Sequence, residues 1–234
     1  MPYNFKDYLE IFKKTSYMDL DTIKKSKIFF LGIDPSISNT GLVILNNEGT
    51  LCAAFNFKKI FVSIYKSKAL RENTLLRIYK MDNILRNVLQ LVKHGKLYIG
   101  IEGYSYASVG RLAQLGELCG SYKLIALSWD VESLVIPPNN VKKYATGHGL
   151  AEKTDIMRRA AAELTSYNID KLIMTSDVCD AYFIAAITYG VNTNNIIGKS
   201  SIGEDLYITR YNIIEQGKSG GFNGKKRKSD TKSV

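Results

Sequence analysis

Two residue types that build metal and disulfide sites are scarce in this chain of 234 residues. It has three cysteines, Cys52, Cys119 and Cys179, and two histidines, His94 and His148. No two cysteines form a CxxC pair, and neither histidine has a partner at the spacing of zinc ligands. We therefore expect no structural zinc site, and the odd cysteine count favours reduced thiols, as in the cytosol.

Long apolar runs are also missing. No run approaches the ~20 residues that a membrane-spanning helix needs. Residues 1–14 mix acids with bases and lack the apolar core of a signal peptide. These absences predict a protein with no membrane partner that works in the cytoplasm, or in the host cytoplasm if its source is viral.

The charge balance is basic. Lys and Arg number 32 against 22 Asp and Glu, which gives a net charge of +10. Six bases and one acid lie in residues 217–234, so the tail carries about half of the excess and the remainder is only mildly basic. This balance favours a polyanionic partner such as nucleic acid or an acidic membrane surface. Charge alone does not separate these from a soluble basic protein without such a partner.

The apolar pattern divides the chain into four parts. Residues 1–26 form an N-terminal extension, 27–192 a core domain, 193–216 a C-terminal extension, and 217–234 a disordered basic tail of Gly, Ser and Lys. One short helix in the first part is expected to dock on the core. The residues on its docking face are Tyr8, Leu9, Ile11, Phe12 and Met18.

The pattern of the core predicts an α/β domain. Strands are expected at 28–34, 40–45, 51–57, 97–102 and 133–136, and helices at 75–92, 110–127, 139–145, 151–164 and 177–190. Asn46–Gly49 supplies a hairpin turn between the second and third strands. The element order βββαβαβααα predicts a mixed five-stranded sheet with helices on both faces.

Four acidic residues stand at the ends of these segments. Asp34 and Glu102 each follow an apolar strand, and Asp177 and Asp180 lie three apart at the start of the last helix. Each alone has an ordinary explanation, as a turn former, a strand-end charge or a helix-start residue. Clustered anions repel one another, however, and a bound divalent cation relieves that repulsion. If the first and fourth strands are parallel neighbours, the acids meet and predict a magnesium site.

Four motifs resemble those of the RuvC-type Holliday junction resolvases, in the same order and over residues 27–190. Gly32–Gly41 (GIDPSISNTG) resembles their first-strand motif, and Ile101–Tyr104 (IEGY) their second acidic motif, especially in viral members. Ala151–Lys153 (AEK) resembles the stretch before their penultimate acidic helix, and Asp177–Ala181 (DVCDA) resembles their closing D-x-x-D-A motif. The richness in Lys, Asn, Ile and Tyr is compatible with an A·T-rich genome, such as that of a phage.

The resemblance implies an RNase H-like fold and a homodimeric crossover junction endodeoxyribonuclease that nicks branched DNA symmetrically. By the same resemblance, Asp34, Glu102, Asp177 and Asp180 are catalytic and hold two Mg²⁺ ions, with Mn²⁺ an alternative. Lys153 is implied to contact the phosphate near the cut, although a solvated lysine at a helix start explains it nearly as well.

The DNA contacts are predicted from residue types. Two tyrosines after Glu102 are suited to stacking on unpaired bases, or to packing inside the protein. Four basic residues form either a phosphate-contacting surface or a solvated basic face. They are Lys142, Lys143, Arg158 and Arg159. The predicted DNA-binding residues are Tyr104, Tyr106, Arg111, Lys142, Lys143, Lys153, Lys225, Lys226, Arg227 and Lys228.

Two other functions compete with junction cleavage. The extra segments at both ends leave a flap-preferring nuclease open, because they affect dimer geometry and the preferred branch. A non-catalytic protein that binds branched DNA on the same fold is a third interpretation. Four retained acids argue against it, since a binder gains nothing from carboxylates that face phosphates.

Overall fold

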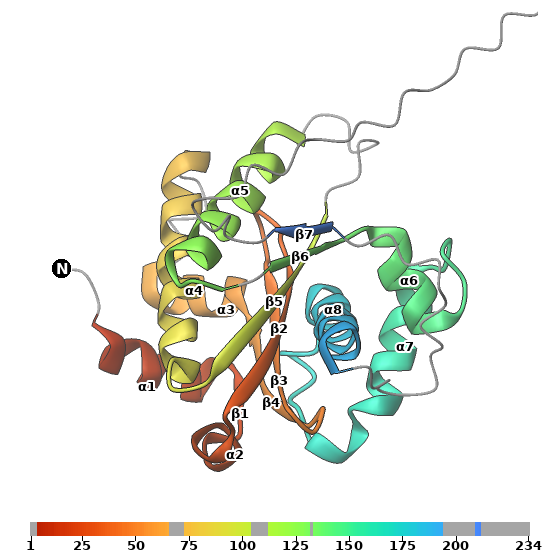
Figure 1. Cartoon of the computed structure of the whole chain (residues 1–234). Coiled ribbons are helices and arrows are strands. Elements are labelled where there is room, and N and C mark those ends of the chain that lie inside the picture. The colour runs from red at the N-terminus through yellow and green to blue at the C-terminus, as the bar shows by residue number, and fades with distance from the viewer. Residues whose placement is uncertain (1–3, 66–72, 104–111, 132, 194–208, 212–234) are drawn as a thin grey trace, which may run out of the picture.

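The computed structural model describes residues 4–65, 73–103, 112–131, 133–193 and 209–211. Seven strands of this part form one mixed sheet in the order β1-β4-β3-β2-β5-β6-β7 (Figure 1). The central strands β2 and β5 are parallel, as are β5 and β6, and the other pairs are antiparallel. The strands are β1 (Tyr17–Met18), β2 (Ile28–Asp34), β3 (Gly41–Asn46), β4 (Leu51–Asn56), β5 (Lys96–Glu102), β6 (Ser133–Ile136) and β7 (Thr209–Tyr211).

The predicted count of five strands was too low. All five predicted strands are present. The predicted hairpin turn joins β3 to β4, and its Gly49 has a φ of 75°. The two missed strands, β1 and β7, are only two and three residues long and lie at the sheet edges. Segments this short show no alternation of apolar and polar residues, so only pairing with a neighbouring strand defines them.

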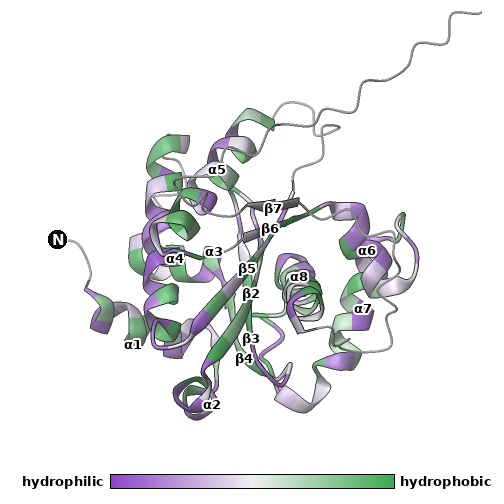
Figure 2. Cartoon of the chain, viewed as in Figure 1, coloured by the Kyte–Doolittle hydropathy of each residue, from purple (hydrophilic) through white to green (hydrophobic). Residues whose placement is uncertain are grey.

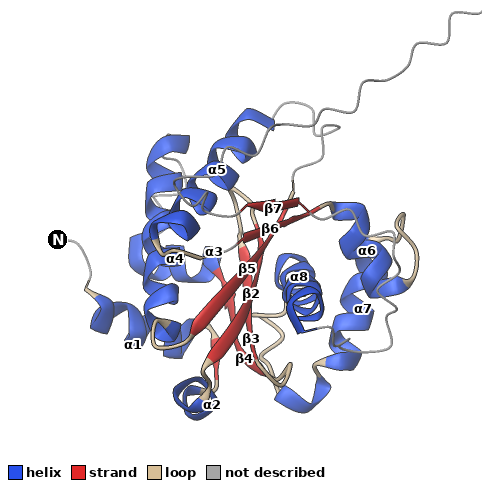
Figure 3. Ribbon diagram, viewed as in Figure 1, coloured by secondary structure: helices blue, strands red, loops and turns tan. Residues whose placement is uncertain are grey.

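Helices cover both faces of the sheet, as predicted (Figure 3). Helices α1, α3, α4 and α5 lie on one face, and α6, α7 and α8 lie on the other (Figure 1). The helices are α1 (Phe5–Thr15), α2 (Leu20–Lys25), α3 (Phe57–Tyr65), α4 (Thr74–Val92), α5 (Leu112–Ser128), α6 (Pro138–Thr146), α7 (Lys153–Glu163) and α8 (Ser176–Thr193), with a 3₁₀ turn at Thr165–Tyr167. In this described part, no helix has the length and apolarity needed to cross a bilayer.

Strand β2 contributes to both hydrophobic cores. Phe29, Leu31 and Ile33 pack with the first group of helices, and Phe30 packs with the second. Alternate residues of a strand point to opposite faces, so a strand covered on both sides is apolar throughout. Figure 2 shows this hydrophobic character along the central strands.

The N-terminal helix docks on the core as predicted. Tyr8 and Phe12 of α1 are buried, and Leu9 and Ile11 are partly buried against them. Met18 packs there too, but it lies in β1, paired with Ala53 of β4, and not in the helix. Residues 5–25 therefore extend both the core and the sheet. The boundaries of the four proposed parts of the chain stay predictions.

Helix α3 was not predicted. The third strand ends at Asn56, and Phe57 begins the helix. Phe57, Ile60, Phe61 and Ile64 are buried at helical spacing. The missed signal was this three-to-four-residue spacing directly after a strand.

Helix α8 is buried along nearly its whole length and lies against β2, β3 and β5. A helix that is apolar on all sides belongs inside a protein. Gly32 of β2 permits the close approach, because a Cβ there would collide with the backbone of Ala181 and Ala185. This contact brings the start of α8 to the carboxyl end of β2.

Candidate active site

Asp34 and Glu102 lie side by side at the carboxyl ends of two parallel strands. Ile33 of β2 pairs with Ile101 of β5, so the next residue on each strand is one of the two acids. Asp34 is buried, with 8% of its surface exposed. Interaction with Glu102 raises the pKa of Asp34, and interaction with Asp34 lowers that of Glu102, as expected for carboxyl groups in close proximity. The sequence-based prediction that these acids meet is confirmed.

The two acids of α8 join the same cluster. Asp177 and Asp180 lie in the first turns of the helix, and a Cβ on Gly41 of β3 would collide with the backbone of Asp177. The charges of both residues act on Asp34, and that of Asp180 also acts on Glu102. All four predicted acids therefore lie together at one end of the sheet.

Burial and mutual repulsion raise the pKa values of three of these acids. Burial, followed by the charges of Glu102 and the two α8 acids, raises the pKa of Asp34 well above its usual value. Burial and Asp180 raise the pKa of Glu102 to about 7. Burial raises the pKa of Asp180 to about 6, against the opposing effect of Lys153. The protein's own cations thus compensate the cluster only in part.

Two lysines supply this partial compensation. Lys153, the first residue of α7, and Lys142 of α6 both lower the pKa of Glu102 and that of Asp180. Lys153 was expected next to the acids. Lys142 was expected only as a DNA contact, and the structure brings it into the electrostatic field of the same site.

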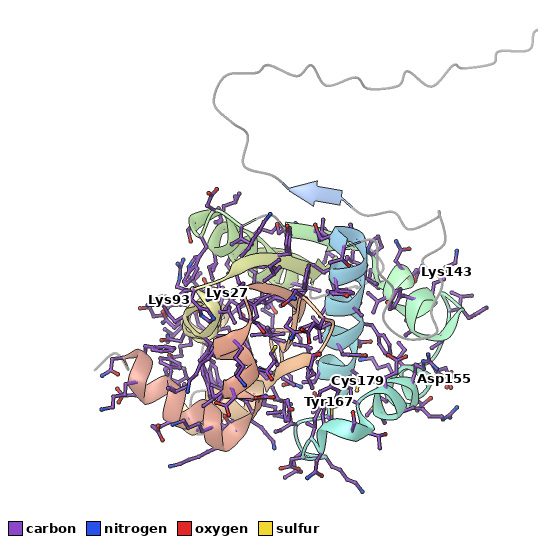
Figure 4. The ribbon with its side chains drawn as sticks, turned by 60° about the horizontal axis from the view of Figure 1, so that its bottom comes forward. Lys27, Lys93, Lys143, Asp155, Tyr167 and Cys179 are labelled. Carbon is purple, nitrogen blue, oxygen red and sulfur yellow. The ribbon has the colours of Figure 1, made fainter. Side chains whose placement is uncertain are left out.

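The other predicted basic residues of α6 and α7 face a separate cleft. A cleft of about 770 Å³ between these helices is lined by Lys143, Arg158 and Arg159, among others. Arg158 Nη1 lies 3.3 Å from Asp155 Oδ1, and Arg159 Nε lies 2.7 Å from Glu163 Oε1. Both guanidinium groups therefore have acidic neighbours. Figure 4 shows Lys143 and Asp155 on the α6–α7 side of the molecule, beyond α8.

Several predicted DNA contacts lie outside the described part of the chain, and their roles stay predictions. They are Tyr104, Tyr106, Arg111, Lys225, Lys226, Arg227 and Lys228.

Sequence reasoning missed one side chain of the site. Asn39 Nδ2 donates a hydrogen bond to Asp177 Oδ2 at 2.6 Å. Asn39 lies inside the first motif, but an asparagine between a serine and a threonine is also typical of an ordinary turn. Only the fold reveals that it contacts an acid so distant in sequence.

The donor chemistry of the cluster fits magnesium. Four carboxylates offer hard oxygen ligands, and the raised pKa values show that added positive charge would stabilise them. Within the described ranges, no three Asp, Glu, His or Cys side chains are already arranged around one metal position. Proteins usually hold Mg²⁺ through one or two carboxylates, with water and phosphate completing its ligands.

The fold and the acid positions define an RNase H-like α/β protein, and solved structures agree. A Thermus thermophilus RuvC structure aligns with a TM-score of 0.51 at 19% identity, covering 71% of this chain and 96% of that one. T. thermophilus RuvC in complex with Holliday junction substrate aligns with a TM-score of 0.53 at 20% identity, covering 69% and 94%. At these identities the likeness establishes the fold.

The sequence comparisons establish the family. The family model for crossover junction endodeoxyribonuclease RuvC matches residues 30–189. The RuvC endonuclease of Christiangramia forsetii is 25% identical over 189 residues, covering 80% of this chain and 92% of the relative. That of Petrotoga mobilis is 26% identical over 152 residues, covering 64% and 86%. The chain therefore belongs to the RuvC crossover junction endodeoxyribonuclease family, whose members generally use Mg²⁺. Its viral character stays a prediction.

Proposed function

We propose that this chain cuts four-way DNA junctions by metal-dependent hydrolysis of phosphodiester bonds. The observation that carries the proposal is the cluster of four acids, three of them with raised pKa values, at the carboxyl ends of β2 and β5. Buried repelling carboxylates destabilise a fold. Their presence in a member of a nuclease family is accounted for by the binding of cations during the reaction.

In this proposal Asp34, Glu102, Asp177 and Asp180 hold two Mg²⁺ ions, or Mn²⁺ in their place. Bound ions of this kind activate water for attack and stabilise the leaving oxygen. The protein supplies buried and half-buried anionic side chains on two strand ends and a helix start. Lys153 and Lys142 would contact the phosphate at the cut. Their electrostatic effect on Glu102 and Asp180, the acids that the phosphate would approach, supports this role.

The DNA backbone would continue over α6 and α7. Lys143 and the two arginines of the cleft offer cations along that path. Arg158 is the more available arginine, because its side chain is 79% exposed and its acidic neighbour is the more distant one. The basic tail would add affinity that is independent of sequence and sensitive to salt.

A homodimer would suit a substrate with two opposed strands. A two-fold axis places two identical sites on those strands. Exposed apolar side chains on the neighbouring helices α4 and α5 support such an interface, since Leu75 is 71%, Tyr79 62% and Leu124 66% exposed. Association through these helices would remove apolar surface from water.

The experiment is cleavage of end-labelled four-way junctions, flaps and plain duplex, with Mg²⁺ or with chelator, beside an Asp34→Asn variant. Paired symmetric nicks in the junction that disappear with chelator or with the substitution would support the proposal. Cleavage of flaps alone would replace it with a branch-trimming nuclease. Tight, metal-independent binding without cleavage of any substrate would leave a junction-binding protein.

A further inference from the structure

Two asparagines hold the start of α8 in parallel ways. Asn39, in the loop between β2 and β3, donates through Nδ2 to Asp177 Oδ2 at 2.6 Å. Asn56, at the end of β4, donates through Nδ2 to the hydroxyl oxygen of Thr175 at 3.3 Å. The two acceptors lie on either side of Ser176, the first residue of α8.

Both asparagines also cap helix α3 through their other amide atom. Asn39 Oδ1 accepts from the backbone N–H of Lys58 at 3.3 Å, and Asn56 Oδ1 accepts from that of Lys59 at 3.2 Å. The first N–H groups of a helix have no partner within the helix, and asparagine oxygens commonly satisfy them. Each asparagine therefore joins α3 to the beginning of α8. Their acceptors there differ, because Asn39 donates to a carboxylate and Asn56 to a hydroxyl.

The loop that carries Asn39 is held in place from several sides. Thr40 Oγ1 donates to the backbone carbonyl of Ser36 at 3.0 Å and shares a buried hydrogen bond of 3.1 Å with the hydroxyl of Tyr122 on α5. Arg77 of α4 donates through Nη2 to the carbonyl of Ile37 at 2.6 Å. A side chain on so constrained a loop can fix the position of the group that it binds.

We propose that Asn39 is a positioning residue for Asp177, which orients this carboxylate toward the cation site. This inference rests on the proposed function and adds a residue to it. With one oxygen of Asp177 held by the amide, the other oxygen and the remaining lone pairs stay available to a cation. Partners that hold metal-binding side chains in this way commonly contribute about 10- to 100-fold to metal affinity.

Asn56 provides the matched control. Replacing either asparagine with alanine removes one cap from α3 and one amide donor to the start of α8. Only Asn39→Ala removes a donor from a carboxylate of the site, whereas Asn56→Ala removes one from a hydroxyl. Asn39→Ser and Asn56→Ser form a second pair, in which a hydroxyl replaces each amide.

The test measures Mn²⁺ binding to the full chain by calorimetry without DNA, and then the Mg²⁺ concentration that gives half-maximal junction cleavage. We expect Asn39→Ala and Asn39→Ser to weaken Mn²⁺ binding by about 10-fold or more. We expect Asn56→Ala and Asn56→Ser to bind like the wild type. Excess Mg²⁺ should restore cleavage by the Asn39 variants, because these substitutions weaken metal binding and a high Mg²⁺ concentration fills the site again. Thermal unfolding with chelator should show similar small losses in all four variants.

Equal Mn²⁺ affinities in the Asn39 and Asn56 variants, whether both normal or both reduced, would overturn the inference and leave helix capping as the role of Asn39. Failure of the proposed function looks different. In that case the wild-type chain itself would bind no Mn²⁺, and Asp177→Asn would change nothing, so the positioning role would be rejected together with the metal site.

Discussion

Asp34 and Glu102 lie side by side at the ends of two parallel strands, where the charge of Glu102 adds to burial in raising the pKa of Asp34. A proton on one of the two carboxyl groups relieves repulsion that would otherwise act in a region of low polarity. The native fold thus keeps an arrangement that costs stability and has no role in packing. Such a cost is expected where side chains are retained for chemistry.

Replacing Asp34 with asparagine should separate activity from stability. We expect Asp34→Asn to lower the rate of junction cleavage by about 100-fold or more, because a neutral amide is a poor cation ligand. At pH 8 with chelator, the free energy of unfolding should rise by about 1–3 kcal/mol, because a buried, repelled carboxylate is lost. Single-turnover cleavage and urea unfolding measure the two effects. Asp21→Asn, at the exposed start of α2, is the control and should change neither.

The stability of the metal-free protein should depend on pH in a defined direction. The pKa of Glu102 is raised from 4.5 to about 7, and that of Asp180 from 3.8 to about 6. Between about pH 4 and pH 7 the native state therefore holds protons that the unfolded chain has released. Stability contributed by these groups must fall as pH rises through this window. Mg²⁺ binds the ionised carboxylates, so its stabilising effect should grow over the same range.

Urea unfolding at pH 5 and pH 8, with chelator or with Mg²⁺, checks this prediction. Because other groups also titrate, the comparison that decides is with Glu102→Gln. This variant should lose less stability than the wild type between the two pH values when chelator is present. An equal or larger loss in the variant would show that Glu102 does not carry the proton.

Neighbouring lysines on α6 should differ in their effect on cleavage. Lys142 lowers the pKa of Glu102 and that of Asp180, whereas Lys143 lines the cleft between α6 and α7. We expect Lys142→Met to reduce the maximal cleavage rate by about 10- to 100-fold and to shift the acidic limb of its pH profile upward. Lys143→Met should act mainly on DNA affinity and its salt dependence. Similar defects in both variants would mean that the two lysines simply share a phosphate-contacting face.

Much of the fold was predictable because its patterns are local. The strand–acid junctions at Asp34 and Glu102 are visible as apolar runs that end in a carboxylate, and the amphipathic spacing of α4 is equally plain. The four acids could be grouped before the structure because parallel strands end at the same edge of a sheet. That grouping depended on one topological assumption, the pairing of β2 with β5, which the structure confirms.

The features that escaped prediction depend on contacts between distant segments. The two edge strands exist only through their partners β4 and β6. The link between Asn39 and Asp177 requires the β2–β3 loop to meet the start of α8. The placement of Lys142 near the acids, with Lys143 directed elsewhere, follows from the rotation of α6 about its axis. No spacing within a single segment encodes these relationships.

The position of α8 should depend on the missing side chain of Gly32. A Cβ at this position would collide with backbone atoms of Ala181 and Ala185, which cannot move aside as a flexible side chain would. We expect Gly32→Ala to lower the free energy of unfolding by about 1–3 kcal/mol through overpacking. Gly116→Ala in α5 is the matched control, because nothing lies within 4 Å of its added Cβ and alanine favours a helix by about 1 kcal/mol. Chemical unfolding measures both.

Since α8 carries Asp177 and Asp180, the Gly32 variant should also need more Mg²⁺ for cleavage than the Gly116 variant. Loss of stability with an unchanged Mg²⁺ requirement would show that the helix start is held independently of its contact with β2.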